Sequence, residues 1–336
     1  MDTKIISSAS LQKLIDALSN ETNLFAPVKK GNQVEFEKIG SISEMTFDYV
    51  STNQSPKNIL FPRNETIMTY TVGRNDVQVS EYKADALKKT VIFGARPCDA
   101  AGLIALEAIF KWDYKDTMYL SRKENTTLIG ISCIKSDEYC FCTSVNGGPG
   151  NTDGLDILLT PIENSEYLAE IITEKGKILA EQFAVNFSES KNSDKQKYLA
   201  NVKKINDFQN ISEKLPAQFD NKEIWLNQSL RCIGCGACAY VCPACACFDI
   251  QDETRGKHGR RVKCWDSCGF RMFTLHTSGH NPREVQSERW RQRVMHKFSY
   301  MPERQQVYGC IGCGRCSRAC PVDMNISEHL KELSEK

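Results

Sequence analysis

The chain has 336 residues, of which 41% are hydrophobic, and this is enough to build the cores of two domains. Its formal net charge of +1 excludes a bulk electrostatic attraction to nucleic acid or to an acidic membrane surface. No apolar stretch approaches the ~18 residues that span a bilayer, and the start Met-Asp-Thr-Lys lacks the pattern of an export signal. We therefore expect a cytoplasmic protein with no membrane span, whose sixteen cysteines stay reduced, from an anaerobic or low-oxygen organism.

The N-terminal part, residues 1–184, has the pattern of an α/β domain. An amphipathic helix is predicted within residues 1–25, capped by Ser8 or Ser10 and ending at Asn20. Its apolar face comprises Leu11, Leu14, Ile15 and Leu18. The stretch from about residue 33 to residue 90 predicts short strands and turns.

A β-α-β unit follows. Residues 90–94 and 127–131 read as buried strands, and a helix capped by Asp99 connects them. Such a crossover connection makes the two strands parallel. Residues 155–159 predict a third strand, and residues 167–183 fit either a hairpin or a strand followed by a helix. Residues 185–228 are polar and rich in lysine, which favours a charged helical linker with a solvated face.

Eight cysteines in the C-terminal third form the same run twice, C-x₂-C-x₂-C-x₃-C-P, over residues 232–243 and again over residues 310–321. In bacterial ferredoxins, three cysteines of each run hold one [4Fe–4S] cluster and the fourth reaches across to the other cluster. We expect the first cluster to be held by Cys232, Cys235, Cys238 and Cys320. We expect the second cluster to be held by Cys310, Cys313, Cys316 and Cys242. Clusters of this kind carry one electron at a time, so the doubled run indicates electron transfer.

The spacing itself favours clusters over other uses of cysteine. Glycines beside the ligands remove Cβ atoms where the chain bends sharply. These glycines are Gly234, Gly236, Gly312 and Gly314. Zinc sites use two C-x₂-C pairs and need neither a third cysteine nor a following proline, and a disulfide set suits secreted proteins. We therefore predict an α+β ferredoxin-like dicluster domain over residues 229–336, with a long insertion over residues 246–306.

Four further cysteines lie in the N-terminal domain: Cys98, Cys133, Cys140 and Cys142. Cys98 and Cys133 each follow a predicted parallel strand, so both are expected at the same carboxyl edge of the sheet, where open α/β sheets bind ligands. Four thiols at one edge suit an additional [4Fe–4S] cluster or a zinc ion. The alternative is four half-buried free thiols that pack as small hydrophobic side chains.

Another four cysteines and a basic run lie within the insertion or directly before it. Cys245, Cys247 and Cys268 have no ligand spacing of their own, so we expect them to pack near the clusters and tune them, or to act as alternative ligands. Of these four cysteines, Cys264 is the one least expected to have a role at the clusters. The basic run predicts a solvated helix, or else positive charge that stabilises a reduced cluster or docks an acidic partner. Its members are Arg283, Arg289, Arg291, Arg293, His296 and Lys297, with Trp290 between them.

The order of these motifs resembles a known family. Arg96-Pro-Cys-Asp99, Ser132-Cys133, Cys140-Phe-Cys142, Trp265-Asp-Ser-Cys268, His296-Lys-Phe and the two ferredoxin-type runs occur in the same order in dicluster electron-transfer subunits. This family is typified by the β subunit of sulfhydrogenase (a NiFe hydrogenase) and by the corresponding iron–sulfur subunit of anaerobic sulfite reductase, and similar chains occur in flavin-based transhydrogenases. The resemblance covers roughly residues 85–325. It implies that the eight ferredoxin-type cysteines are ligands and that the four N-terminal cysteines hold a further cluster.

The resemblance also implies a role. We expect an iron–sulfur subunit that relays single electrons between a flavin-containing subunit handling NAD(P)H and a further redox subunit, within a hetero-oligomeric oxidoreductase, and that is not catalytic alone. The alternative is a reductase in its own right that binds a flavin or a substrate in the N-terminal domain. A DNA-binding regulator is disfavoured by the neutral charge.

Overall fold

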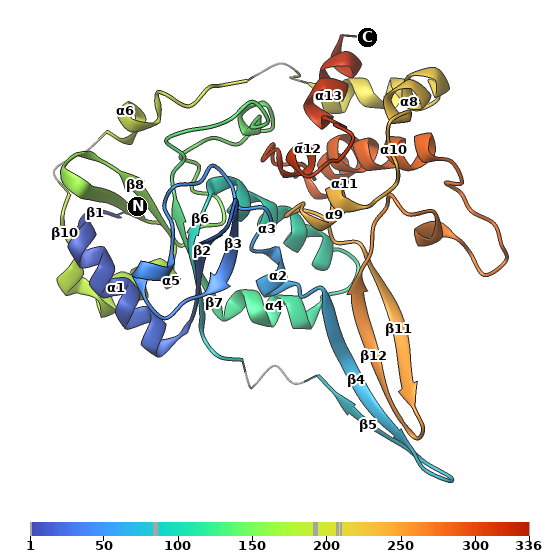
Figure 1. Ribbon diagram of the computed structural model, residues 1–336, viewed down its shortest axis with the longest axis horizontal. Helices are drawn as coiled ribbons and strands as arrows, with labels where there is room; N and C mark the ends of the chain where they lie inside the picture. Colours follow the sequence, from blue (N-terminus) through green and yellow to red (C-terminus); the bar gives the residue numbers. More distant parts are fainter. Residues whose placement is uncertain (1, 83–86, 191–193, 206–207, 209, 336) are drawn as a thin grey trace.

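The computed structural model describes residues 2–82, 87–190, 194–205, 208 and 210–335. A mixed sheet with flanking helices forms one part of the molecule, and helices of the C-terminal third pack against one end of it (Figure 1). A second, smaller sheet extends from the body as a long arm (Figure 1). The arrangement therefore has a mixed α/β layer and a mainly helical C-terminal region that carries most of the cysteines.

The large sheet has eight strands in the order β10-β1-β9-β8-β7-β6-β2-β3. Its strands are β1 (Asp2–Ser7), β2 (Asn23–Lys30), β3 (Gln33–Lys38), β6 (Thr90–Ala95), β7 (Thr126–Ile131), β8 (Ile157–Pro161), β9 (Glu166–Ile171) and β10 (Ser188–Glu189). The four strands β2, β6, β7 and β8 run parallel to one another, and the remaining pairs are antiparallel. Helices cover this sheet: α1 (Ser8–Glu21), α3 (Pro97–Phe110), α4 (Thr117–Glu124) and α5 (Glu174–Gln182).

The predicted β-α-β unit is confirmed. Strands β6 and β7 are buried almost throughout, as expected for parallel strands with helices on both faces. Helix α3 starts directly after β6, with Pro97 in its first turn and the Asp99 carboxylate accepting the backbone N–H of Arg96 at 2.9 Å. Of the two predictions for residues 167–183, the strand followed by a helix is the observed one.

The first helix is also present, but its start differs from the prediction. Ser7 rather than Ser8 or Ser10 caps α1, because its side chain accepts the backbone N–H of Ser10. The four expected apolar residues are buried against the sheet: Leu11, Leu14, Ile15 and Leu18. The preceding strand β1 pairs with β9, a contact across more than 150 residues that local pattern does not reveal.

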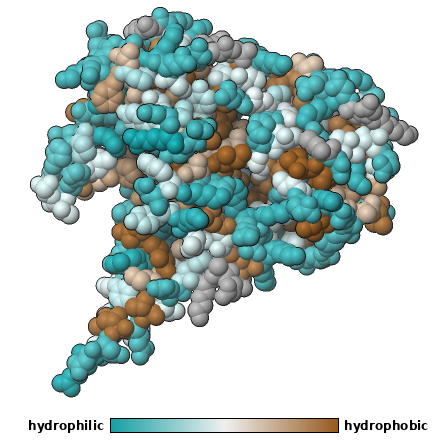
Figure 2. Space-filling model, turned by 180° about the vertical axis from the view of Figure 1, so that it is seen from behind, coloured by the Kyte–Doolittle hydropathy of each residue, from teal (hydrophilic) through white to brown (hydrophobic). Residues whose placement is uncertain are grey.

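The arm is a four-stranded antiparallel sheet in the order β11-β12-β4-β5. Its strands are β4 (Asn64–Val72), β5 (Val77–Glu81), β11 (Phe248–Arg255) and β12 (His258–Trp265). The predicted insertion therefore pairs with a segment of the predicted N-terminal domain, and the two domains share one sheet. Hydrophobic side chains are visible on the surface of the arm in Figure 2, and its exposed residues include Val72, Val77, Val79 and Ile250.

The C-terminal region is built from short helices. They are α8 (Lys222–Ser229), α9 (Ala237–Tyr240), α10 (Gln286–Met295), α11 (Met301–Gln305), α12 (Arg315–Arg318) and α13 (Ile326–Ser334), together with a π-helical turn, His296–Tyr300. The remaining helices are α2 (Lys57–Leu60), α6 (Lys195–Leu199) and α7 (Ile211–Lys214). No helix in the described ranges is both long and apolar enough to cross a membrane.

The segment 185–228 departs from a solvated linker. Phe208, Ile211, Leu215 and Trp225 are buried in the same hydrophobic core as α10 and α13. The many polar and charged residues of this segment make its average composition hydrophilic. These four apolar side chains are nevertheless buried by tertiary packing. Residues 191–193, 206, 207 and 209 of this segment lie outside the described residues.

Candidate metal centres

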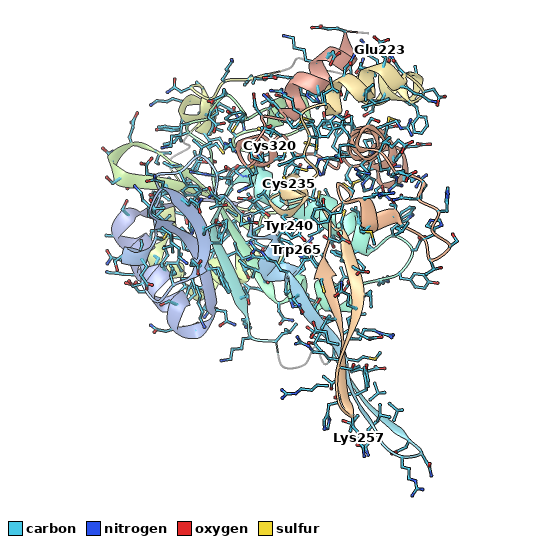
Figure 3. The ribbon with its side chains drawn as sticks, turned by 45° about the vertical axis from the view of Figure 1, so that its right-hand side comes forward. Glu223, Cys235, Tyr240, Lys257, Trp265 and Cys320 are labelled. Carbon is cyan, nitrogen blue, oxygen red and sulfur yellow. The ribbon has the colours of Figure 1, made fainter. Side chains whose placement is uncertain are left out.

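The first cysteine set, Cys232, Cys235, Cys238 and Cys320, lines one small cavity of about 40 Å³. Figure 3 shows Cys235 and Cys320 close together where the arm meets the C-terminal helices. The ferredoxin spacing predicts that these four residues share one cluster, although Cys320 is 82 positions beyond Cys238. The fold brings the same four thiols together.

Local backbone geometry explains the glycines of this set. Gly234 and Gly236 have φ values of +69° and +74°, which L side chains rarely adopt. A Cβ on Gly236 would also lie 2.5 Å from the ring of Phe270. Two groups donate to the thiols: the Gln286 side-chain amide lies 3.1 Å from Cys232 Sγ, and the Met324 backbone N–H lies 3.2 Å from Cys320 Sγ. Such donors orient sulfur ligands and form part of the surroundings that tune a bound metal group.

The second cysteine set comprises Cys242, Cys310, Cys313 and Cys316, and two links connect the segment of Cys242 with the segment of Cys310. The Lys297 ammonium lies 3.4 Å from Cys242 Sγ and donates to the Gly309 carbonyl, next to Cys310, at 2.6 Å. In addition, Pro243 and Ile311, which follow Cys242 and Cys310, both lie against Gly102 of α3. Burial raises the pKa of the Cys310 thiol to about 12, so this sulfur stays protonated unless a cation replaces the proton.

The third cysteine set, Cys98, Cys133, Cys140 and Cys142, also lines a single cavity, of about 30 Å³. Cys98 lies in the first turn of α3, and Cys133 follows β7, so both lie at the carboxyl edge of the parallel strands as predicted. Burial raises the pKa of Cys133 to about 11 and that of Cys142 to about 12. The four thiols are thus gathered in a low-dielectric place, where bound metal would have to displace their protons.

The loop of the third set packs directly on the second ferredoxin-type run. The backbone N–H of Phe141 donates to the Gly312 carbonyl at 2.8 Å. A Cβ on Gly312 would lie 2.5 Å from the backbone nitrogen of Cys142, and a Cβ on Gly314 would lie 2.6 Å from the Tyr139 carbonyl. Both glycines also have positive φ, so they allow the close approach as well as the sharp turn.

The cavities of the first and third sets each include a cysteine of the second set. Cys316 of the second set lines the cavity of the first set, and Cys313 of the second set lines the cavity of the third. The second set therefore lies between the other two.

Two arginines of the second run hold this arrangement together. Arg315 forms an ion pair with Asp99 at 2.7 Å, and both side chains are almost completely buried. Arg318 forms an ion pair with Asp137 at 2.6 Å and lies 3.2 Å from Cys140 Sγ. Both arginines link a ferredoxin-type motif to the loops of the third set. The spacing of the cysteines does not predict this role for the two arginines. Their charge inside the run Cys313-Gly-Arg-Cys-Ser-Arg-Ala-Cys320 is the feature of the sequence that could have indicated it.

Three of the four remaining cysteines, Cys245, Cys247 and Cys268, lie close to these sets. Cys245 accepts from the Arg293 guanidinium at 3.7 Å, and Cys268 lines the cavity of the first set. Cys247 and Cys268 share a hydrogen bond, which, together with Arg293, lowers the pKa of Cys268 to about 6. Cys264 lies on β12 of the arm, paired with Asp249 and Asn64.

The basic run is not a solvated helix throughout. Arg293, Lys297 and Trp290 are buried, with Arg293 and Lys297 each 4% exposed. Arg293 lies at the end of α10 and Lys297 in the π-helical turn that continues it, and these positions turn both cations toward the cysteines. The expectation of a solvated face is therefore wrong for these residues, because tertiary packing covers the helix.

All sixteen cysteines are free thiols, so the disulfide alternative has no support. Within the described residues, no group of three or more His, Cys, Asp or Glu side chains converges tightly enough to hold a single metal ion. The donor sets of the first and third cavities fit a larger sulfur-ligated group, since six thiols line the first cavity and five line the third. The four thiols of the second set share no single cavity among the described residues: Cys316 lines the first cavity, Cys313 the third, and Cys310 a further one.

Comparison with known proteins agrees with these observations. A family model described as a 4Fe-4S dicluster domain matches residues 231–324. The chain is 29% identical to the sulfhydrogenase 2 subunit beta of Pyrococcus furiosus over 342 residues, which cover 98% of this chain and 97% of the relative. No solved structure matches. The resemblance drawn from the cysteine motifs is thereby confirmed, and the findings support an iron–sulfur electron-transfer subunit.

Proposed function

We propose that this chain is the electron-relay subunit of a multisubunit oxidoreductase. In this proposal it passes single electrons between a flavin-containing subunit that oxidises or reduces NAD(P)H and a further redox subunit of the hydrogenase, sulfite reductase or transhydrogenase type. The similarity to a sulfhydrogenase β subunit over nearly the full chain supports an assembly of this kind. The observation that carries the relay is the order of the three cysteine sets, with cysteines of the second set lining the cavities of both others.

Each set would have its own part in the relay. When bound, a [4Fe–4S] cluster supplies reversible one-electron chemistry. The thiols of the first and second sets would hold two clusters, while Gln286, Met324 and Lys297 donate to the sulfurs. Cys235 is exposed, so the first set lies nearest to solvent and is the proposed point of exchange with one partner.

We assign a third [4Fe–4S] cluster to the third set, with a zinc ion as the alternative. The set has four thiols and an Arg318 guanidinium beside Cys140, and it packs on the second run through Gly312. A redox-active group at this place extends the chain of electron carriers, whereas zinc has no redox chemistry and would act only as a structural tie. Cys245, Cys247 and Cys268 are proposed to line and tune the clusters rather than to hold one.

Metal analysis tests these assignments. The chain is purified anaerobically, and iron, acid-labile sulfide and zinc are measured per chain. Three clusters predict about twelve irons, and the ferredoxin-type pair alone predicts about eight. One zinc per chain together with eight irons would refute the third cluster but leave the pair intact. A colourless, iron-free protein would refute the relay itself.

A second function is favoured by one observation. A cavity of about 550 Å³ opens between the second and third sets, lined by Cys98, Cys142 and Cys310 and by the loop residues Gly147 and Gly148. Its volume falls in the range of small-molecule sites, so the chain could bind a flavin or substrate here and act as a reductase in its own right. Stoichiometric flavin in the isolated chain, with NAD(P)H oxidation, would favour this function over the relay.

The partners and the setting of the relay are also part of the proposal. We infer a hetero-oligomer in the cytoplasm of an anaerobic organism, because reduced clusters need a reducing compartment. Affinity purification of the native chain under anaerobic conditions, followed by identification of the co-purifying subunits, tests this. A flavoprotein in stoichiometric amount is expected, and recovery of the chain with no redox partner would contradict it.

A further inference from the structure

Three buried cations surround the short segment that carries Cys242 and Cys245. They come from different elements: Lys57 from α2, Arg293 from the end of α10, and Lys297 from the π-helical turn. Lys57 is 2% exposed, and the other two are each 4% exposed. Taking three charges out of water at one place is costly unless negative charge is bound beside them.

Each of the three cations makes short contacts with this segment. The Lys297 ammonium lies 3.4 Å from Cys242 Sγ, and an Arg293 Nη atom lies 3.7 Å from Cys245 Sγ while the other donates to the Cys238 carbonyl at 2.8 Å. The Lys57 ammonium donates to the Cys245 carbonyl at 3.1 Å. It also lies 3.8 Å from the centre of the Trp265 ring, a position that stabilises its positive charge.

Two of the arginines beside the third set are compensated by carboxylates. Arg315 and Arg318 form ion pairs with the carboxylates of Asp99 and Asp137. Among the residues that the structure describes, no ion pair of this kind is formed by the three cations at Cys242 and Cys245. Within the described residues, three buried cations without an ion pair therefore lie at Cys242 and Cys245, and one of them, Arg293, also lines the cavity of the first set. Beside the third set, the described part of the chain has one such cation, Arg96, which donates to the Ser132 carbonyl at 3.1 Å. The excess of uncompensated positive charge is thus on the side of the second set.

We propose that Lys57, Arg293 and Lys297 raise the reduction potential of the cluster at the second set above that of the cluster at the third set. The proposal rests on the relay function given above. Reduction adds one negative charge to a cluster, and nearby uncompensated cations stabilise that charge in a low-dielectric interior. Electrons would then collect at the middle of the relay, and the third set would form its low-potential end.

Redox titration followed by electron paramagnetic resonance tests the proposal on the full-length, cluster-loaded chain. The variant Lys297→Met removes one cation beside Cys242. At the wild-type midpoint it should lower the ratio of reduced to oxidised second cluster at least tenfold, which equals about 59 mV for a one-electron couple. The variant Lys297→Arg keeps the positive charge, so its ratio of reduced to oxidised second cluster should be close to that of the wild type. If Lys297 acted only through packing, keeping the charge would not restore this ratio.

Two controls make the result interpretable. Lys257→Met removes a lysine from the exposed tip of the arm, labelled in Figure 3, and should leave every midpoint unchanged. Cys310→Ala and Cys133→Ala identify the signals of the second and third clusters, since each variant should lose one signal. In the wild type, the signal that Cys310→Ala loses should appear at higher potential than the signal that Cys133→Ala loses.

Two results would overturn the proposal. One is an unchanged midpoint in a Lys297→Met protein that still contains the second cluster. The other, which decides the matter even if Lys297→Met fails to hold its cluster, is a wild-type third cluster that is reduced before the second. Neither result affects the relay function, whereas a chain without iron would refute the relay before any titration is made.

Discussion

The buried ion pair between Arg315 and Asp99 gives the sharpest stability prediction. It joins the second ferredoxin-type run to the start of α3, with an N···O distance of 2.7 Å and side chains 1% and 0% exposed. The change Asp99→Asn removes the negative charge and leaves the arginine charge buried. Removing one partner of such a pair costs about 3–5 kcal/mol. Because asparagine can still accept the backbone N–H of Arg96, we expect a loss of about 3 kcal/mol.

The assay is anaerobic urea denaturation of the cluster-loaded chain, followed by tryptophan fluorescence and cluster absorbance together. The variants Asp99→Asn and Arg315→Met and their double mutant form a cycle, and a coupling of about 1–3 kcal/mol is expected. Arg271→Met provides the matched control, because Arg271 and Glu284 are also 2.7 Å apart but are more than 60% exposed, so its cost should stay below about 1 kcal/mol. If Asp99→Asn costs no more than this control, the ion pair does not join the two regions as argued.

Three further predictions address the cysteine sets. Cys235→Ala should lower the iron content by about four per chain and reduce visible absorbance, whereas Cys264→Ala should leave both unchanged, and the opposite pattern would show that the ligands are misassigned. Gly312→Ala places a Cβ 2.5 Å from the backbone of Cys142, at a φ of +64°. The loss of folding stability should therefore exceed the ~1–3 kcal/mol of backbone strain alone, and the iron occupancy of the third set should fall. A urea midpoint and an iron content equal to those of the wild type would contradict this prediction. Burial raises the pKa of the free Cys142 thiol to about 12, so this thiol takes up a proton when iron is released. The loss of cluster absorbance in the presence of a chelator should therefore become faster as the pH falls from 8 to 6. A loss that becomes faster toward higher pH would contradict this prediction.

Local sequence patterns were sufficient for much of the molecule. Strands β6 and β7, helix α3 and the apolar face of α1 follow from hydrophobic period and capping, because these signals lie within a few residues of one another. The grouping of the first and third cysteine sets also follows from the sequence, in one case from ligand spacing and in the other from the common edge of parallel strands. The cavities of both sets agree with that grouping.

Other features depended on contacts between distant segments. The arm pairs β4 with β12, about 190 residues apart, and the linker segment buries Trp225 and Phe208 although its composition is polar. The charges of Arg293 and Lys297 fit a solvated helix in the sequence, and only the packing of α10 against the cysteines buries them.

The amino-acid sequence by itself determined the two ferredoxin-type runs and the prediction of which of their thiols share a cluster, because the ligand spacing of a cubane lies within a few neighbouring positions. Tertiary structure alone decided how the three sets are ordered and which cations lack carboxylate partners. Those properties depend on distance and burial between segments remote in the chain, and electrostatic energies follow distance and dielectric rather than position in the sequence.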